Sequence, residues 1–264
     1  DMTIKVTGYQ WKWGYDYLND GISFYSVLST PREQIEGRAE KGEHYLLEVD
    51  EPVVVPVGKR VRLLITANDV IHSWWIPALS AKQDAIPGFI RDAWFKADKI
   101  GTYRGQCVEL CGKDHGFMPI VVEVVSEADY AAWVAKKKGA ATAVAADNTK
   151  TFDPAELVAR GEKVYATNCA ACHQANGMGV PGAFPAINGS KVATGPLDEH
   201  VRTVLNGRPG TAMAAFGAQL SDADLAAVVT YQRNAWDNKT GDAAQPAMIA
   251  AARGGNEAAA PAAQ

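Results

Sequence analysis

The amino-acid sequence predicts two domains, an all-β sandwich followed by an all-α domain. Residues 1–125 contain short β-branched runs separated by glycine and proline, which is typical of a sandwich or barrel. Residues 152–241 instead carry helix-start patterns followed by apolar residues at helical spacing. The segment between them, residues 126–151, is predicted to be a short helix and a linker.

Three runs support the β domain. Residues 53–58 and 120–125 are rich in valine, and residues 60–65 alternate apolar with basic side chains, as on a half-buried strand. After them, Ser126 and Asp129 form a capping-box pattern that starts a helix. Its apolar face would hold Tyr130, Trp133 and Val134. The alanine- and threonine-rich residues 139–150 lack hydrophobic periodicity, which indicates a linker.

The α domain is expected at residues 152–241. Asp153 followed by Pro154 suits a helix N-terminus, and the first helix would run to the second cysteine pair. A second helix start lies at Ser221. Residues 242–264 are alanine-rich with scattered glycine, proline and glutamine, so we expect a disordered tail.

Composition excludes some classes of function. A net charge of −4 argues against a nucleic-acid partner, since such proteins usually carry a basic excess. No apolar run approaches the ~18 residues of a transmembrane helix, and no signal-peptide pattern is present.

The strongest motif is Cys-x-x-Cys-His, formed by Cys169, Cys172 and His173. This is the attachment pattern of haem c: the two thiols reach the two vinyl groups and the histidine faces the iron. A redox cysteine pair or half of a zinc site is the alternative. Zinc would need further ligands, and His200 is the only other histidine in this half.

The iron needs a sixth ligand, and methionine is the usual partner of histidine in cytochromes c. The candidates are Met178, Met213, Met248 and His200. Met178 follows His173 too closely to reach the opposite face, Met248 lies in the predicted tail, and His200 is expected on a helix surface. Met213 is therefore predicted, from a loop rich in glycine and proline. The alternative is a methionine that packs against the haem edge.

A second group of potential ligands lies within residues 105–118: Cys107, Cys111, His115 and Met118. Soft sulfur with imidazole suits copper, and two cysteines would let two copper ions share bridging thiolates. His72 follows a predicted strand and precedes Pro77, where it could supply the second histidine. A zinc site or a disulfide is the alternative, although zinc sites rarely recruit methionine.

Residues 107–118 resemble the CuA domain of cytochrome c oxidase subunit II, with a complete C-x-E-L-C-G-x-x-H-x-x-M pattern. Residues 10–17 are similar to the aromatic stretch of that family, and residues 82–88 to the segment that faces subunit I. The resemblance covers residues 2–125. It implies a cupredoxin Greek-key sandwich.

The resemblance also implies site residues. The ligands of a binuclear CuA centre would be His72, Cys107, Cys111, His115 and Met118, with the backbone carbonyl of Glu109. Trp11 would be the residue through which electrons reach the copper, although it could equally be a packed strand aromatic. The side chain of Glu109 would contribute to a magnesium site shared with subunit I.

Residues 152–241 resemble a class I cytochrome c. The resemblance implies that the helix with Gly161 and Tyr165 crosses the last helix near Tyr231. It also implies that the carbonyl of Pro185, or of its competitor Pro181, orients His173.

Together the halves resemble the fused subunit II of caa3-type oxidases. That implies electron flow from an external cytochrome or respiratory complex, through haem c and CuA, to haem a of subunit I in a proton-translocating oxidase. Subunit I and other membrane subunits would be partners, at the periplasmic or extracellular face of a bacterial inner membrane. The family's two N-terminal transmembrane helices are absent from this sequence.

Other functions remain as alternatives. They are a CuA and haem c subunit of a nitric oxide reductase, and a free-standing soluble electron carrier. Five histidines are too few for the copper-cluster domain of nitrous oxide reductase. A complete ligand set also argues against a copper chaperone, because it would hold the metal rather than release it.

Overall fold

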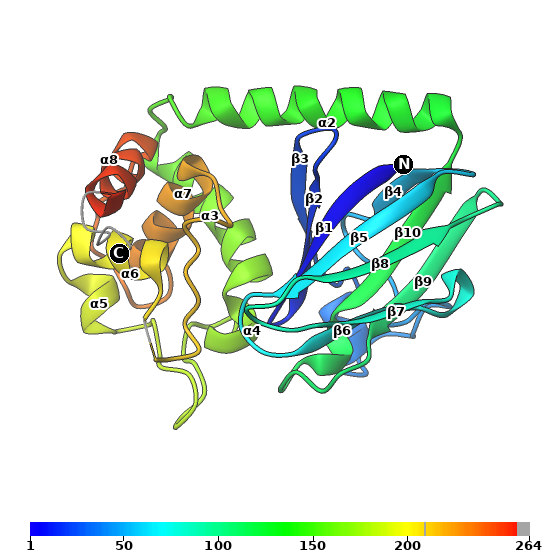
Figure 1. Cartoon of the computed structure of the whole chain (residues 1–264). Coiled ribbons are helices and arrows are strands. Elements are labelled where there is room, and N and C mark those ends of the chain that lie inside the picture. The colour runs from blue at the N-terminus through cyan, green and yellow to red at the C-terminus, as the bar shows by residue number, and fades with distance from the viewer. Residues whose placement is uncertain (209, 258–264) are drawn as a thin grey trace. The chain divides into compact units, whose positions relative to one another are not determined.

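The computed structural model describes residues 1–208 and 210–257 and divides into two units, Asp1–Gly139 and Ala140–Gln264. The first unit is built from strands (Figure 1). They are β1 Met2–Tyr9, β2 Lys12–Tyr17, β3 Ile22–Ser26, β4 Val53–Pro56, β5 Arg60–Ala67, β6 His72–Ile76, β7 Ala81–Ala85, β8 Arg91–Lys96, β9 Gly101–Cys107 and β10 Pro119–Val125. A short helix, α1 Arg32–Ile35, lies between β3 and β4.

The strands form two five-stranded sheets, in the orders β3-β2-β1-β5-β8 and β4-β10-β9-β6-β7. The β1–β5 and β10–β4 pairs are parallel and the other pairs are antiparallel. The predicted alternation in β5 is confirmed, because Val61, Leu63 and Ile65 are buried while Arg60 and Arg62 are exposed. One core fills the space between the sheets.

The topology brings distant segments to one end of this sandwich. His72 begins β6 and Cys107 ends β9, and these strands pair at Trp74 and Cys107. The loop after β9 then returns to β10 immediately after Met118. The predicted copper ligands, His72 and those within residues 107–118, therefore meet at the same end of the sandwich.

Helix α2 spans Glu127–Asp147, and its start agrees with the predicted capping box. The amide of Asp129 donates to Oγ of Ser126 at 3.1 Å, and the ring of Trp133 packs 5.0 Å from that of Tyr17. The predicted linker over residues 139–150 is wrong as far as Asp147, because the helix continues. Alanine has the highest intrinsic helix propensity, so such a segment stays helical without an apolar face.

The second unit is helical, with its own core. Its helices are α3 Pro154–Asn168, α4 Ala170–His173, α5 Lys191–Thr194, α6 Leu197–Asn206, α7 Asp222–Asn234 and α8 Pro246–Glu257. A capping box at Asp153 and an N-cap at Ser221 start α3 and α7. Gly161 lets these helices touch, since a Cβ there would lie 2.1 Å from the carbonyl oxygen of Ala227. The rings of Tyr165 and Tyr231 pack 5.5 Å apart at this crossing.

The expectation of a disordered tail is wrong for the part that forms α8. Ile249 is 1% exposed in the core, and Arg253 pairs with Asp222 and donates to the carbonyl of Leu220. Burial of these side chains stabilises α8, which the alanine-rich composition did not indicate. Residues 258–264 lie outside the described residues.

The predicted fold class, an all-β sandwich followed by an all-α domain, is confirmed. None of the helices in the described residues combines the length and the apolar composition that a membrane crossing requires.

Candidate metal and haem centres

The predicted copper ligands converge in the first unit, and we call them the copper cluster: His72, Cys107, Glu109, Cys111, His115 and Met118. The donor atoms of His72, Cys107 and Cys111 all lie within 4.8 Å of one another. Sγ of Cys111 lies 3.9 Å from Sγ of Cys107, 3.4 Å from Nδ1 of His115 and 3.5 Å from Sδ of Met118. Sγ of Cys107 lies 4.0 Å from Nδ1 of His72 and 3.4 Å from the carbonyl oxygen of Glu109.

These donors fit copper. Two close thiolates, two imidazoles and a thioether are soft and borderline ligands, and a methionine at van der Waals distance from a cysteine sulfur suits a weak axial position. Met118 is 1% exposed and His72 is fully buried, so water is excluded from most of the cluster.

Electrostatics in the copper cluster favour a first thiolate at Cys107. The hydrogen bond from the Cys111 thiol lowers the pKa of Cys107, and the neighbouring His72 and backbone contacts add to this effect. The same interaction raises the pKa of Cys111. Burial lowers the pKa of His72, but its hydrogen bonds to Asp69 and Cys107 outweigh burial and raise it.

Trp11 contacts the copper cluster through Cys111. Its Nε1 donates to the carbonyl oxygen of Cys111 at 3.2 Å, and Nε2 of Gln10 donates to the same oxygen at 2.8 Å. Asp69 extends this network, because Oδ2 accepts from the amide of Gln10 and Oδ1 lies 2.8 Å from Nε2 of His72. The indole thus lies one hydrogen bond from the backbone of a predicted ligand.

Sequence reasoning missed two residues that shape this centre, Gly8 and Asp69, and it named Gln10 and Trp13 only as members of the aromatic stretch 10–17. Trp13 is fully buried, its ring lies 5.9 Å from the imidazole of His72, and its Nε1 donates to the carbonyl of Met118 at 3.2 Å. Gly8 leaves room for His72, since a Cβ there would lie 2.7 Å from Cδ2 of the ring. A loop aspartate three residues before His72 was a usable signal, but most loop aspartates are solvated.

The segment expected to face subunit I forms β7 and the turn after it. In it, Oδ1 of Asp84 accepts from Oγ of Ser73 at 2.8 Å, beside His72. Glu109, whose side chain is the predicted magnesium ligand, is an exposed residue.

The haem motif lies at the junction of α3 and α4. The amide of His173 donates to the carbonyl of Cys169 at 2.9 Å, so Cys169, Cys172 and His173 share one turn of helix. Cys169 is 6% exposed and Cys172 is half-buried.

Pro185 rather than Pro181 contacts the histidine. Nδ1 of His173 donates to the carbonyl oxygen of Pro185 at 2.8 Å, because a carbonyl only accepts. Gly179 permits this loop, since its φ is +64° and a Cβ would lie 2.6 Å from that same oxygen. Burial lowers the pKa of His173 despite the bond to Pro185. Nε2 remains available to a metal, which together with the cysteine spacing fits haem c.

The candidates for the sixth ligand are placed as follows. Met213 is half-buried in the loop before α7, where its carbonyl accepts from the amide of Arg208 at 3.0 Å and its amide donates to Oγ1 of Thr211 at 3.2 Å. Met178 and Met248 are 54% and 40% exposed. Met213 as iron ligand stays a prediction.

The expectation of a surface position for His200 is wrong, because the side chain is 3% exposed on α6. Nε2 lies 2.9 Å from Oε1 of Gln232 on α7. That amide replaces water as a hydrogen-bond partner, which makes burial of the imidazole tolerable.

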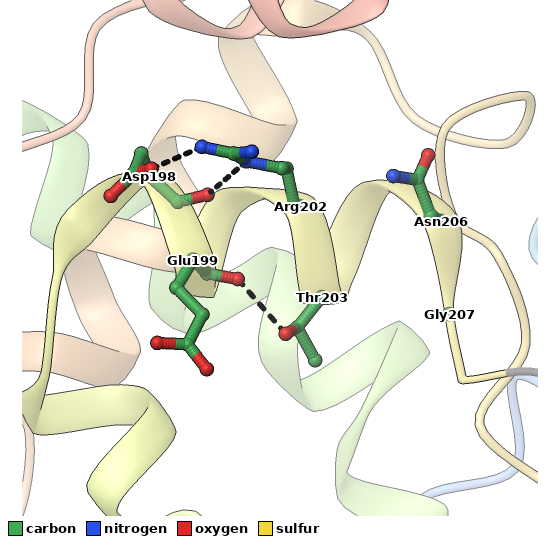
Figure 2. A pocket seen from close by; sticks show the side chains of 6 residues that line it. All are labelled: Asp198, Glu199, Arg202, Thr203, Asn206 and Gly207. Atoms are coloured by element: carbon green, nitrogen blue, oxygen red, sulfur yellow. Dashed lines mark hydrogen bonds and ion pairs between the residues drawn. The ribbon is translucent and has the colours of Figure 1, made fainter. Parts of the chain in front are cut away.

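An open pocket of about 430 Å³ lies along α6, and none of the predicted site residues lines it (Figure 2). Its walls are Asp198, Glu199, Arg202, Thr203, Asn206 and Gly207. Arg202 pairs with Asp198, and Oγ1 of Thr203 donates to the carbonyl of Glu199 at 2.9 Å. These polar groups are satisfied within the helix, so the pocket does not point to a ligand.

Comparison with known proteins agrees with both units. Residues 2–125 match the family described as cytochrome c oxidase subunit II, periplasmic domain, and residues 156–231 match cytochrome c oxidase, cbb3-type, subunit III. Cytochrome c oxidase subunit 2 of Cereibacter sphaeroides is 45% identical over 152 residues, which cover 53% of this chain and 50% of the relative. A probable cytochrome c oxidase subunit 2 of Rickettsia prowazekii is 49% identical over 138 residues, covering 52% and 42%.

The chain thus spans about half the length of the relatives it matches. Among solved structures, the periplasmic domain of subunit II of cytochrome oxidase of Bradyrhizobium japonicum is 44% identical, with a TM-score of 0.48, and the match covers 53% of this chain and 94% of that one. The two matched families imply CuA copper and haem c, which the donor sets above fit. Residues 2–125 therefore match the periplasmic domain of cytochrome c oxidase subunit II, and residues 156–231 match a second family, cytochrome c oxidase, cbb3-type, subunit III.

Proposed function

We propose that this chain is the electron-transfer subunit of a terminal haem–copper oxidase. Electrons would pass from an external cytochrome or respiratory complex through haem c to CuA, and then to haem a of subunit I, where oxygen is reduced. The observation that carries this proposal is the presence of both donor sets on one chain: the copper cluster and the Cys169–Cys172–His173 motif. When bound, the copper pair and the haem each take up and release an electron.

Four side chains of the copper cluster, those of His72, Cys107, Cys111 and Met118, are buried, which supports rapid transfer. His72, Cys107, Cys111, His115 and Met118 would hold the copper pair, with the carbonyl of Glu109. Asp69 contacts the imidazole of His72, and Trp13 donates to the backbone carbonyl of Met118. These contacts limit how far the two residues can rearrange when the charge changes. One chain also keeps donor and acceptor at a high effective concentration.

Trp11 is proposed as the residue through which electrons reach the copper, and its contact with the carbonyl of Cys111 supports this role. Trp11→Phe should slow reduction of the copper by the donor and leave the copper absorption spectrum unchanged. Trp94→Phe is the matched control, because Trp94 is 56% exposed on β8 and contacts Arg60 rather than the copper cluster. Equal reduction rates in both variants would exclude Trp11 from the route.

In the cytochrome domain, Cys169 and Cys172 would hold the haem, while His173 and Met213 would ligate its iron and Pro185 would orient His173. Met213→Ala should abolish the thioether-to-iron charge-transfer band at the red end of the visible spectrum. Met178→Ala should leave this band intact, because Met178 is exposed. Persistence of the band in Met213→Ala would assign the sixth position to another residue.

The exposed side chain of Glu109 is proposed as a ligand of magnesium at an interface with subunit I. Manganese substituted into the isolated oxidase gives an electron paramagnetic resonance signal that reports its ligands. Glu109→Gln should change that signal while the copper spectrum stays constant. An unchanged manganese signal would remove Glu109 from the site.

The proposed location is the periplasmic or extracellular face of a bacterial inner membrane, in a complex with subunit I and other membrane subunits of a proton-translocating oxidase. The deciding experiment is purification from membranes through a tag on this chain, followed by assays of oxygen and nitric oxide consumption. Oxygen consumption with a co-purified membrane subunit supports the proposal. Nitric oxide consumption would instead assign the chain to a nitric oxide reductase, and the absence of a membrane partner would indicate a free electron carrier.

A further inference from the structure

A buried histidine in the cytochrome domain, His200, was a candidate for the sixth iron ligand but belongs to neither of the proposed ligand sets. His200 on α6 is 3% exposed, and its Nε2 lies 2.9 Å from Oε1 of Gln232, which is itself 2% exposed on α7. An amide oxygen only accepts hydrogen bonds, so Nε2 of His200 carries the proton and donates. This bond fixes which end of the Gln232 amide faces α6.

The other end of the same amide faces the haem motif. Nε2 of Gln232 lies 3.8 Å from Sγ of Cys169, which is 6% exposed at the end of α3. Nδ2 of Asn238 donates to the backbone carbonyl of Gln232 at 2.7 Å and anchors this part of α7. Three buried side chains from three elements therefore form a directed chain, from His200 through Gln232 to the sulfur of Cys169.

Packing alone does not account for a histidine here. Nδ1 of His200 is buried without a hydrogen-bond partner among the described residues, which destabilises the folded protein. An apolar side chain would avoid that cost. Burial also lowers the pKa of His200 to about 4, so the ring is neutral near pH 7 and keeps its single N–H directed at Gln232.

We propose that His200 is a positioning residue for the haem: it orients the Gln232 amide so that Nε2 donates a hydrogen bond to the sulfur of Cys169. This inference rests on the proposed attachment of haem c to that sulfur. A donor at a thioether withdraws electron density from the attached macrocycle, which favours the electron-rich reduced form. The chain of hydrogen bonds therefore raises the reduction potential of the haem.

Two variants test these hydrogen bonds by potentiometric titration of the haem in the haem-loaded protein. Gln232→Met keeps length and burial but removes the donor, and His200→Phe removes the group that orients the amide. Each variant should decrease the equilibrium constant for haem reduction at least about twofold. This change corresponds to a fall of about 18 mV in the reduction potential of the haem. His200→Gln retains an N–H donor and should restore part of the potential.

Val204→Ala is the matched control, because Val204 is 3% exposed on the same helix and its side chain has no polar group. It should lower stability and leave the potential unchanged. Unchanged potentials in Gln232→Met and His200→Phe would overturn the inference, as would an equal shift in Val204→Ala.

A spectroscopic measurement covers variants that fail to fold. In the unaltered protein, the C–S stretching band of the haem linkage in resonance Raman spectra should shift between H₂O and D₂O, because the amide proton exchanges. No shift would also overturn the inference. A pyridine haemochrome spectrum separates the two proposals: absence of covalent haem refutes the haem assignment itself, whereas bound haem without these shifts refutes only the role of His200.

Discussion

Oδ1 of Asp69 lies 2.8 Å from Nε2 of His72, on the side of the imidazole away from the cysteine sulfurs. With Nε2 directed at the carboxylate, Nδ1 is the nitrogen that faces Sγ of Cys107, at 4.0 Å. A carboxylate behind a metal-binding histidine fixes its tautomer and its orientation. Asp69 also accepts from the amide of Gln10 at 2.8 Å, so one residue ties His72 to the strand connection that carries Trp11.

Removal of this carboxylate should weaken copper binding. Asp69→Asn leaves an amide that can present either end to His72, and we expect copper affinity to fall by about 10- to 100-fold, as is usual for such partners. Competition with a chelator measures the affinity. Asp92→Asn is the control, because it removes an exposed carboxylate that pairs with Arg62 on β5 and does not contact the copper cluster. Equal affinities would mean that backbone geometry alone positions His72.

The imidazole of His72 can occupy its position only because residue 8 is glycine. In Gly8→Ala the new methyl group would lie 2.7 Å from Cδ2 of His72, closer than carbon atoms approach, so the ring must move. We expect an altered visible copper spectrum and about tenfold weaker copper binding. Gly116→Ala serves as the comparison, because a Cβ there meets no atom within 4 Å. Matching spectra for the two variants would contradict the close contact.

The thioether of Met118 should tune the copper potential. Sδ lies 3.5 Å from Sγ of Cys111, and the side chain is 1% exposed. Met118→Leu should retain copper but shift its reduction potential, since the strength of the axial ligand sets the potential of such sites. A shift of about 59 mV corresponds to a tenfold change in a one-electron equilibrium. Met2→Leu, which changes a methionine buried in the same core, should leave the potential constant; a constant value in Met118→Leu would remove Met118 from the ligand set.

Acid should destabilise the cytochrome domain through His200. Burial lowers the pKa of this side chain from 6.5 to about 4 in the folded protein, so the unfolded chain takes up a proton first as pH falls. The contribution of neutral His200 to the free energy of unfolding is therefore fully present above pH ~6.5. It is lost progressively as the pH falls toward ~4, by about 3 kcal/mol in total. Denaturant unfolding of the haem protein at pH 7 and pH 4 measures this loss. His200→Phe should show a pH dependence that is smaller by this amount, and identical pH dependences would show that His200 does not titrate on unfolding.

Local patterns were sufficient for most elements. The alternation in β5, the capping box at Asp153 and the N-cap at Ser221 were all predicted, because each depends on residues close together in the chain. The two errors in regular structure have opposite causes. Helix α2 extends to Asp147 because its alanine-rich end has a high helix propensity and because Asp147 pairs with Arg160. Helix α8 instead depends on burial of Ile249 in the core of the helical unit.

The sequence by itself determined the types of the candidate ligands and their spacing: two thiols, an imidazole and a thioether within residues 107–118, and Cys-x-x-Cys-His at residues 169–173. Short spacings constrain geometry, so these motifs carry their chemistry locally. Only the tertiary structure decided the partners. Asp69 behind His72, Pro185 rather than Pro181 on His173, and Gln232 between His200 and Cys169 are contacts between separate segments, set by strand pairing and helix packing.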